Sequence, residues 1–156
     1  MIWAVIPAAG SGMRSGSDIP KQYRPLLGKP MIEYSLDILA QHPDIDGIIL
    51  ALAADDARWQ HISQWHNAPL RTCLGGMRRS DSVLAAIEAL DDVVHNDTWL
   101  LVHDAARPCV RFEDLNRLIE AACVHPVGGL LAGRMKDTVK RGDADHQVEG
   151  TLDRSA

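Results

Sequence analysis

Short runs of apolar residues recur along the chain, and each is followed by a polar or amphipathic stretch. The first run, residues 2–6, holds two isoleucines and a valine without a polar interruption. Such runs predict strands that are buried on both faces, as in a parallel sheet. Comparable runs predict four further strands, the last weakened by its glycines, at residues 48–54, 70–74, 98–102 and 127–132.

Segments with apolar side chains at helical spacing lie between these runs. They cover residues 31–42, 55–66, 81–90 and 112–123. Pro30 suits the start of the first helix, and Ser80 or Asp81 can cap the third. Because strand and helix alternate, the sequence predicts an α/β fold in which helices cover both faces of a parallel sheet.

The pattern changes from residue 133 onward, where the chain becomes polar and rich in charge. Two short alternating pieces, residues 136–141 and 147–154, flank a turn-forming stretch at residues 142–145. This arrangement predicts a β-hairpin with little apolar surface of its own. An isolated hairpin is marginally stable in water, so we expect it to pack against a neighbour, and a second subunit is the obvious candidate.

Three of the predicted loops carry residues suited to chemistry, and all three follow strands. They hold Pro7–Lys21, the Gly75-Gly76 pair, and Asp104 with Arg107. Ligands of open parallel sheets gather beyond the carboxyl ends of the strands. We therefore expect the three loops to share one edge of the sheet.

The first loop combines small residues with two cations, Arg14 and Lys21. Glycine and alanine let phosphate groups approach backbone N–H groups closely, and the cations add positive charge. The spacing is not that of a dinucleotide-binding fingerprint, because Ser15 stands where the third glycine belongs. It is not a P-loop either, since Gly10 and Gly16 are one residue too far apart and no lysine follows Gly16.

Composition narrows the class of protein. The chain has 156 residues, 46% of them hydrophobic and 24% charged, which suits a single globular domain. A net charge of −5 argues against non-specific nucleic-acid binding. Three cysteines without a C-x-x-C pair suit a reducing compartment, and no apolar stretch approaches the ~20 residues of a membrane span. Since Met1 leads directly into the first strand, we expect no signal peptide and a cytoplasmic, bacterial protein.

Six motifs together resemble the bacterial 2-C-methyl-D-erythritol 4-phosphate cytidylyltransferase family, along essentially the whole chain. They are PAAGSGMR at 7–14, PKQY at 20–23, GG-x-x-R-x-D-S-V at 75–83, VHDAARP at 102–108, DTVKR at 137–141 and TLDR at 151–154. The resemblance implies a Rossmann-like, doubly wound and mostly parallel sheet with a protruding β-hairpin arm for dimerisation. Residues 1–156 would form one nucleotidyltransferase domain, incomplete at its C-terminus, with the arm at residues 133–154.

The resemblance also implies an activity and roles for single residues. The family transfers CMP from CTP to the phosphate of 2-C-methyl-D-erythritol 4-phosphate with the help of Mg²⁺, and releases pyrophosphate. Arg14 and Lys21 would be catalytic, and Asp104 would hold the metal. Arg107, together with Thr138 and Arg154 reaching across from a partner subunit of a homodimer, would bind the acceptor. Nucleotide binding would fall to Pro7, Ala8, Ala9, Gly10, Gly12, Gly76, Ser82, Asp104 and Ala105.

Two other functions remain open at this point. A ribitol 5-phosphate cytidylyltransferase shares the fold and most motifs of the CTP site. A non-catalytic module for CTP binding or dimerisation is the second alternative, because members of the family continue past the position of Ala156. Since every earlier motif is intact, we expect a fragment of a longer protein rather than a naturally shortened copy.

Overall fold

A computed structural model describes residues 1–10, 19–62 and 69–153 of the chain. Its centre is a four-stranded parallel sheet of order β5-β4-β1-β6. The strands are β1 (Ile2–Pro7), β4 (Gly47–Leu52), β5 (Leu70–Leu74) and β6 (Trp99–Val102). The predicted α/β class and the mostly parallel sheet are confirmed.

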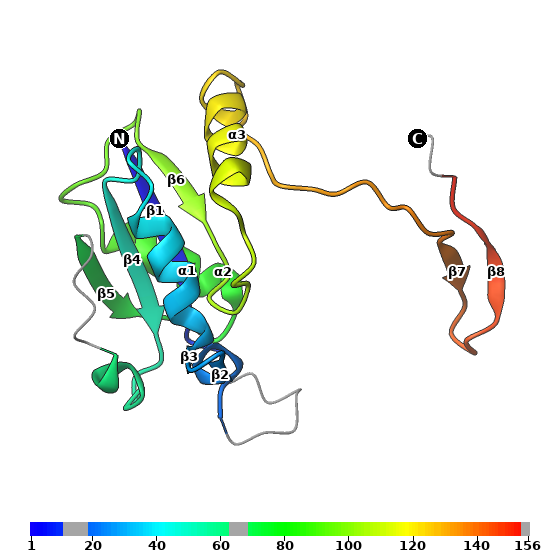
Figure 1. Cartoon of the computed structure of the whole chain (residues 1–156), viewed down its shortest axis with the longest axis horizontal. Coiled ribbons are helices and arrows are strands. Elements are labelled where there is room, and N and C mark those ends of the chain that lie inside the picture. The colour runs from blue at the N-terminus through cyan, green and yellow to red at the C-terminus, as the bar shows by residue number, and fades with distance from the viewer. Residues whose placement is uncertain (11–18, 63–68, 154–156) are drawn as a thin grey trace.

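Helices cover both faces of this sheet (Figure 1). The helices are α1 (Met31–Ala40), α2 (Arg79–Glu88) and α3 (Phe112–Cys123). Alternate residues of β1 enter different cores, because successive side chains of a strand point to opposite faces. Ala4 and Ile6 pack with Leu36 of α1 and Leu115 of α3, whereas Val5 packs on the α2 side. This two-sided burial is why β1 reads as an uninterrupted apolar run.

Short elements fill the connections. The 3₁₀ helix η2 (Lys21–Tyr23) follows the first loop, and a small antiparallel pair joins β2 (Pro25–Leu26) to β3 (Lys29–Pro30). The sequence did not predict this pair. Lys29 is anchored by an ion pair with Asp37 of α1, which holds the pair against the helix.

One predicted helix, at residues 55–66, is wrong in its described part. The chain forms turns and only a single 3₁₀ helix, η3 (Trp59–His61). The Asp56 carboxylate accepts a hydrogen bond from the Trp59 N–H at 3.2 Å, which stabilises a local turn at the position where the helix was expected. Residues 63–66 lie outside the described ranges.

The predicted strand at residues 127–132 is also wrong. These residues form no strand, and Gly128 has a φ of +110°, a conformation that interrupts an extended run. Val127 and Leu130 remain 89% and 79% exposed. Among the described residues, β6 is therefore an edge strand of the sheet.

The caps of α2 also differ from the prediction. The helix begins at Arg79 and its N-cap is Arg78, not Ser80 or Asp81. Asp81 nevertheless stabilises the helix start, because its carboxylate accepts a hydrogen bond from the Arg78 N–H at 3.1 Å.

The C-terminal hairpin is confirmed, with shorter strands than predicted. It consists of β7 (Lys140–Gly142) and β8 (Val148–Thr151), and every residue of both strands is exposed. The Asp143 carboxylate organises its turn by accepting hydrogen bonds from the N–H groups of Asp145 and Gln147. Figure 1 shows the hairpin at the end of an extended segment, standing apart from the sheet.

None of the helices in the described ranges is both long and apolar enough to cross a membrane.

Candidate functional site

The candidate site lies at the edge of the sheet where all four parallel strands end (Figure 1). β1 leads into Ala8–Gly10, β5 into Gly75 and Gly76, and β6 into His103 and Asp104. Hydrogen bonds tie the first two loops to β4: Ala8 N–H donates to the Ala51 carbonyl at 2.8 Å, and Gly75 N–H to the Leu52 carbonyl at 2.7 Å. For the described parts of these loops, the prediction that they share one edge is confirmed.

The loops after β1 and β5 touch each other through small residues. A Cβ atom on Gly75 would lie 2.5 Å from the Ala9 Cβ and 2.9 Å from the Ser82 Oγ. Both distances are too short for real atoms, so no side chain fits at position 75. Ala8, Ala9, Gly76 and Ser82, which were predicted to bind a nucleotide, are thereby gathered in one place.

Ser82 holds the glycine loop against the start of α2. Its Oγ accepts a hydrogen bond from the Gly76 N–H at 3.1 Å and lies 3.3 Å from the carbonyls of Gly76 and Arg78. The residue is 3% exposed. Ser82 thus has a structural reason to be serine, and its predicted contact with a nucleotide stays a prediction.

η2 places an exposed lysine beside this edge. Lys21 begins the element, and in the described part of the chain it has no ion-pair partner. Tyr23 anchors the other end, since its hydroxyl donates to the Asp56 carboxylate at 2.6 Å. Burial, followed by the neighbouring Asp56, raises the pKa of Tyr23 well above its usual range. Tyr23 therefore stays protonated and keeps this anchor at any physiological pH.

Asp104 is held by two arginines from different segments. Arg79 Nε donates to one carboxylate oxygen and Arg107 Nε to the other, each at 2.8 Å. Burial raises the pKa of Asp104, but the hydrogen bond from Arg79 and the charges of both arginines outweigh it, so that the pKa lies below its usual range. The carboxylate is therefore ionised at neutral pH.

Arg79 is the residue that sequence reasoning did not assign. It stands beside Arg78, and as an adjacent pair the two were as readily explained as solvated charges. Only the fold brings the first residue of α2 against a loop 25 positions further along the chain. The available signal was the arginine inside the GG-x-x-R-x-D-S-V motif.

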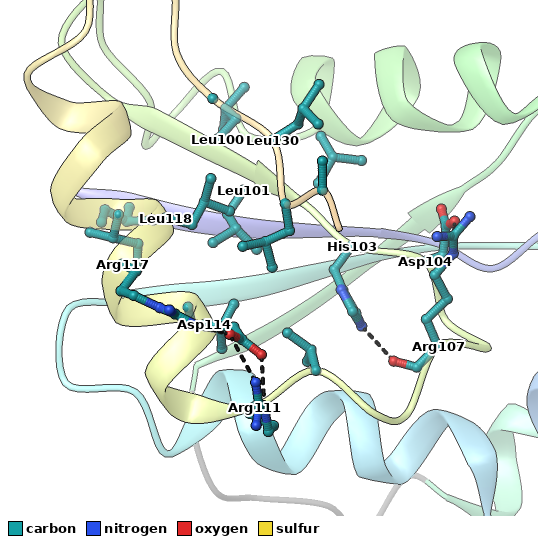
Figure 2. Close-up of a pocket in the computed structure, with 18 of the residues that line it drawn as sticks. Leu100, Leu101, His103, Asp104, Arg107, Arg111, Asp114, Arg117, Leu118 and Leu130 are labelled. Carbon is teal, nitrogen blue, oxygen red and sulfur yellow. Dashed lines mark hydrogen bonds and ion pairs between the residues drawn. The ribbon is translucent and has the colours of Figure 1, made fainter. Parts of the chain in front are cut away.

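His103 stabilises the turn that carries Asp104 and Arg107. Its Nε2 lies 3.1 Å from the Arg107 carbonyl oxygen, so this nitrogen carries the proton and donates (Figure 2). Desolvation by burial lowers the pKa of His103, and the interactions with Arg107 and Asp104 offset this only in part. The neutral ring is therefore the form that the fold favours.

This depressed pKa predicts a loss of stability on acidification. In the unfolded chain His103 binds a proton below about pH 6.5, whereas in the folded protein it does so only at a lower pH. The contribution of His103 to the stability of the fold is therefore complete above about pH 6.5 and is lost as the pH falls below it. The free energy of unfolding of the wild-type chain should therefore fall between pH 7.5 and 5. We expect this slope to be smaller in His103→Gln, by at most about 1.4 kcal/mol per pH unit. Urea unfolding at several pH values measures it. The control is His95→Gln, which replaces an exposed histidine and should keep the wild-type slope. An unchanged slope in His103→Gln would contradict the lowered pKa of His103 in the folded protein.

A cleft of about 1100 Å³ adjoins the site along β6 and α3. Figure 2 shows leucines gathered at one end of it, with His103, Asp104 and Arg107 at the other. Its lining includes Arg79, Asp104 and Arg107 but none of the residues of the β1 and β5 loops. The cleft thus meets the predicted site only at Asp104 and its arginines, and most of it is the uncovered apolar flank of the edge strand β6.

The remaining predicted site residues fall into three groups. Gly12, Arg14 and Arg154 lie outside the described residues. Thr138 is exposed on the segment that leads to the hairpin, and Figure 1 shows this segment extending away from the sheet. Pro7 ends β1 beside the loop, and Ala105 is buried in the core with Ala8.

The described ranges contain no group of three or more His, Cys, Asp or Glu side chains that could hold a metal ion by itself. This does not disagree with Mg²⁺, which proteins often bind through one or two carboxylates together with substrate phosphates. The partly exposed, ionised Asp104 supplies an oxygen ligand of the right chemistry. It would have to exchange an arginine for the metal.

Comparisons with known proteins agree on one family. The family model described as 2-C-methyl-D-erythritol 4-phosphate cytidylyltransferase matches residues 2–156. Curated proteins of that name from Xylella fastidiosa (strain 9a5c) and Xanthomonas campestris pv. campestris (strain B100) are 51% and 47% identical to this chain over 150 residues. These matches cover 96% of this chain but only 65% and 57% of the relatives, so the chain spans less than two thirds of their length.

Solved structures give the same result for the fold. A crystal structure of 4-diphosphocytidyl-2C-methyl-D-erythritol synthase superimposes with a TM-score of 0.83 at 32% identity, covering 99% of this chain and 68% of that one. The Francisella tularensis 2-C-methyl-D-erythritol 4-phosphate cytidylyltransferase has a TM-score of 0.79 at 34% identity, covering 97% and 65%.

Proposed function

Because the chain belongs to the 2-C-methyl-D-erythritol 4-phosphate cytidylyltransferase family, we propose that it is the larger part of an enzyme that transfers CMP from CTP to 2-C-methyl-D-erythritol 4-phosphate. The observation that carries this proposal is the convergence of the loops after β1, β5 and β6 at one edge of the sheet. The products are 4-diphosphocytidyl-2-C-methyl-D-erythritol and pyrophosphate. A cytoplasmic location follows from this role in the synthesis of isoprenoid precursors.

The chemistry is an in-line displacement at the α-phosphorus of CTP. An oxygen of the acceptor's phosphate forms a bond to that phosphorus, the bond to the bridging oxygen of the β-phosphate breaks, and pyrophosphate leaves with the electron pair. The attacking phosphate is already ionised near neutral pH, so no general base is needed. The protein's work is to position the groups and to stabilise negative charge.

Lys21 and Arg14 are assigned the role of stabilising the negative charge at the α-phosphate. Two unit charges 4 Å apart interact by roughly 4 kcal/mol at an effective dielectric constant near 20, whereas exposed helix-end dipoles contribute about 0.3–1 kcal/mol. Side-chain cations therefore outweigh backbone dipoles. The exposed position of Lys21 on η2 and its lack of a described ion-pair partner leave its ammonium available for a phosphate.

Asp104 is assigned as a ligand of Mg²⁺, with Arg79 and Arg107 as its partners when no nucleotide is bound. A divalent ion held there would neutralise negative charge of the triphosphate. Asp104 would then no longer pair with Arg79 and Arg107. Both guanidinium groups could instead bind phosphate oxygens, which match their planar donors.

The small residues after β1 and β5 are assigned to the nucleoside. Ala8, Ala9, Gly10 and Gly76 offer backbone groups and, together with Ser82, carry only small side chains or none beside the base and the ribose. The absence of space at Gly75 supports this assignment, because the two loops pack as a unit and leave their outer surface to a ligand.

The acceptor is assigned to a site shared between two subunits. In one chain, the exposed Thr138 belongs to the arm, which Figure 1 shows extending away from the sheet. A homodimer formed through the arm at residues 133–154 would carry Thr138 and Arg154 of one subunit to Arg107 of the other. The fully exposed strands β7 and β8 support such a partner, since an isolated hairpin is only marginally stable.

The test uses a hybrid in which this chain replaces the matched 65% of the Xylella fastidiosa relative. We expect this hybrid to release pyrophosphate from CTP only when 2-C-methyl-D-erythritol 4-phosphate and Mg²⁺ are both present. Coupled detection of pyrophosphate measures the rate. Ribitol 5-phosphate is the matched acceptor for comparison.

Faster turnover with ribitol 5-phosphate would assign the chain to the alternative reaction. A hybrid that folds and binds CTP but releases no pyrophosphate with either acceptor would support a non-catalytic CTP-binding module instead.

A further inference from the structure

The buried polar side chain of Gln22 lies between the predicted catalytic lysine and its anchor. Gln22 is 6% exposed, and Lys21 and Tyr23 flank it in η2. A buried amide group costs free energy unless its N–H and C=O groups find partners. An apolar residue at this position would avoid that cost, so the presence of glutamine needs an explanation.

The partners of Gln22 are two carbonyl groups of the loop that follows β1. Its Nε2 donates to the Ala8 carbonyl at 2.8 Å and to the Gly10 carbonyl at 3.3 Å. A side-chain amide nitrogen carries two hydrogens, so one group can serve both acceptors. Gln22 thus spans the beginning and the end of a three-residue stretch that has no large side chain of its own.

This contact determines the orientation of the peptide groups in the loop. In a planar trans peptide, the C=O group and the following N–H group point in opposite directions. Holding the Ala8 carbonyl toward Gln22 therefore turns the Ala9 N–H away from it. Backbone N–H groups that face outward from such a loop are available to donate hydrogen bonds to a bound nucleotide.

Gln22 can hold the loop because η2 is itself held. Tyr23 is 7% exposed and packs in the same core cluster as Ala8 and Ala105. Its hydroxyl donates to Asp56 in the connection after β4, and its N–H donates to the Pro20 carbonyl at 2.9 Å. Since Gln22 and Lys21 are adjacent on this anchored element, η2 fixes the positions of the loop and of Lys21 relative to each other.

We propose that Gln22 is a positioning residue that fixes residues 8–10, directly after β1, in the conformation that receives CTP, at a fixed position relative to Lys21. The inference rests on the proposed function and adds to it a residue that contacts no substrate. A residue with a purely packing role would be replaceable by an apolar side chain of the same shape, and this difference can be measured.

The first measurement needs no activity. In Gln22→Leu of the 156-residue chain, we expect NMR order parameters of Ala9 and Gly10 to fall from about 0.85, typical of rigid backbone, to below about 0.6. Residues of β4 should keep their wild-type values. Gln22→Asn, which keeps the amide but is too short for both carbonyls, is the second variant and should show the same loss.

The second measurement uses the hybrid with the Xylella fastidiosa relative. We expect Gln22→Leu to raise KM for CTP about tenfold or more, while KM for the acceptor stays at the wild-type value. The matched control is Asn116→Leu, which removes the hydrogen bond of another buried polar side chain, His42, just after the C-terminal end of α1. It should lower stability and leave both the loop order parameters and KM for CTP unchanged.

The outcomes separate this inference from the proposed function. Wild-type order parameters in both Gln22 variants, or a mobile loop with an unchanged KM for CTP, would overturn the positioning role. An inactive wild-type hybrid would instead overturn the proposed function, while the order parameters would still decide whether Gln22 holds the loop.

Discussion

Replacing Lys21 with alanine is expected to lower kcat of the hybrid enzyme by about a hundredfold to a thousandfold, with the fold intact. Removal of a single group that stabilises transition-state charge typically costs this much. Lys21 is exposed and forms none of the ion pairs that the structure describes, so its loss leaves the core and the surface network unchanged. Steady-state kinetics and circular dichroism measure the two parts of this expectation.

Lys29→Ala is the matched control for Lys21→Ala. Lys29 is a lysine of the same connection, but its ammonium is already paired with Asp37 and lies over the ring of Tyr34. Its loss should reduce stability slightly and leave turnover unchanged. A Lys21→Ala enzyme with near wild-type kcat would show that the charge at the α-phosphate is stabilised elsewhere.

Asp104→Asn is expected to lower turnover by about a hundredfold and to raise the Mg²⁺ concentration needed for half-maximal activity. Asparagine keeps the shape of the side chain but removes the charge that a hard cation requires. The fold should tolerate the change, because the partner arginines are 59% and 77% exposed and can be solvated. Titration of activity with Mg²⁺, together with direct measurement of Mn²⁺ binding in the presence of CTP, tests both effects.

Asp114 offers a control with the same local chemistry. Its carboxylate is also held by two arginines, Arg111 and Arg117, but it lies on α3, away from the strand ends. Asp114→Asn should leave the Mg²⁺ requirement unchanged. If Asp104→Asn and Asp114→Asn behave alike, Asp104 does not bind the metal and its ion pairs are structural.

The sequence predicted those parts of the fold that follow from local pattern. Strands such as β1 and β4 were found because both of their faces are buried, which leaves a continuous apolar run. α3 was predicted with its observed boundaries because its apolar stripe has a clear period. The convergence of the loops after β1, β5 and β6 followed from the rule that parallel strands end at one edge.

The wrong predictions occurred where a local contact or a missing neighbour overrides the pattern. At residues 55–62, Asp56 forms a turn with Trp59 and a hydrogen bond with Tyr23, and both compete with a helix. At residues 127–132, apolar composition suggested a strand, but a strand needs a partner along its backbone, and the described chain provides none there.

The sequence by itself determined the α/β class, the hairpin and the set of motifs that identifies the family, because these depend on residue type and spacing along the chain. Only the tertiary structure decided that Arg79 pairs with Asp104 and that Gln22 holds the carbonyls of Ala8 and Gly10. These contacts join side chains to partners on other elements. Hydrogen bonds act over about 3 Å, and no periodicity in a sequence records which distant atoms the packing of helices on a sheet will bring that close.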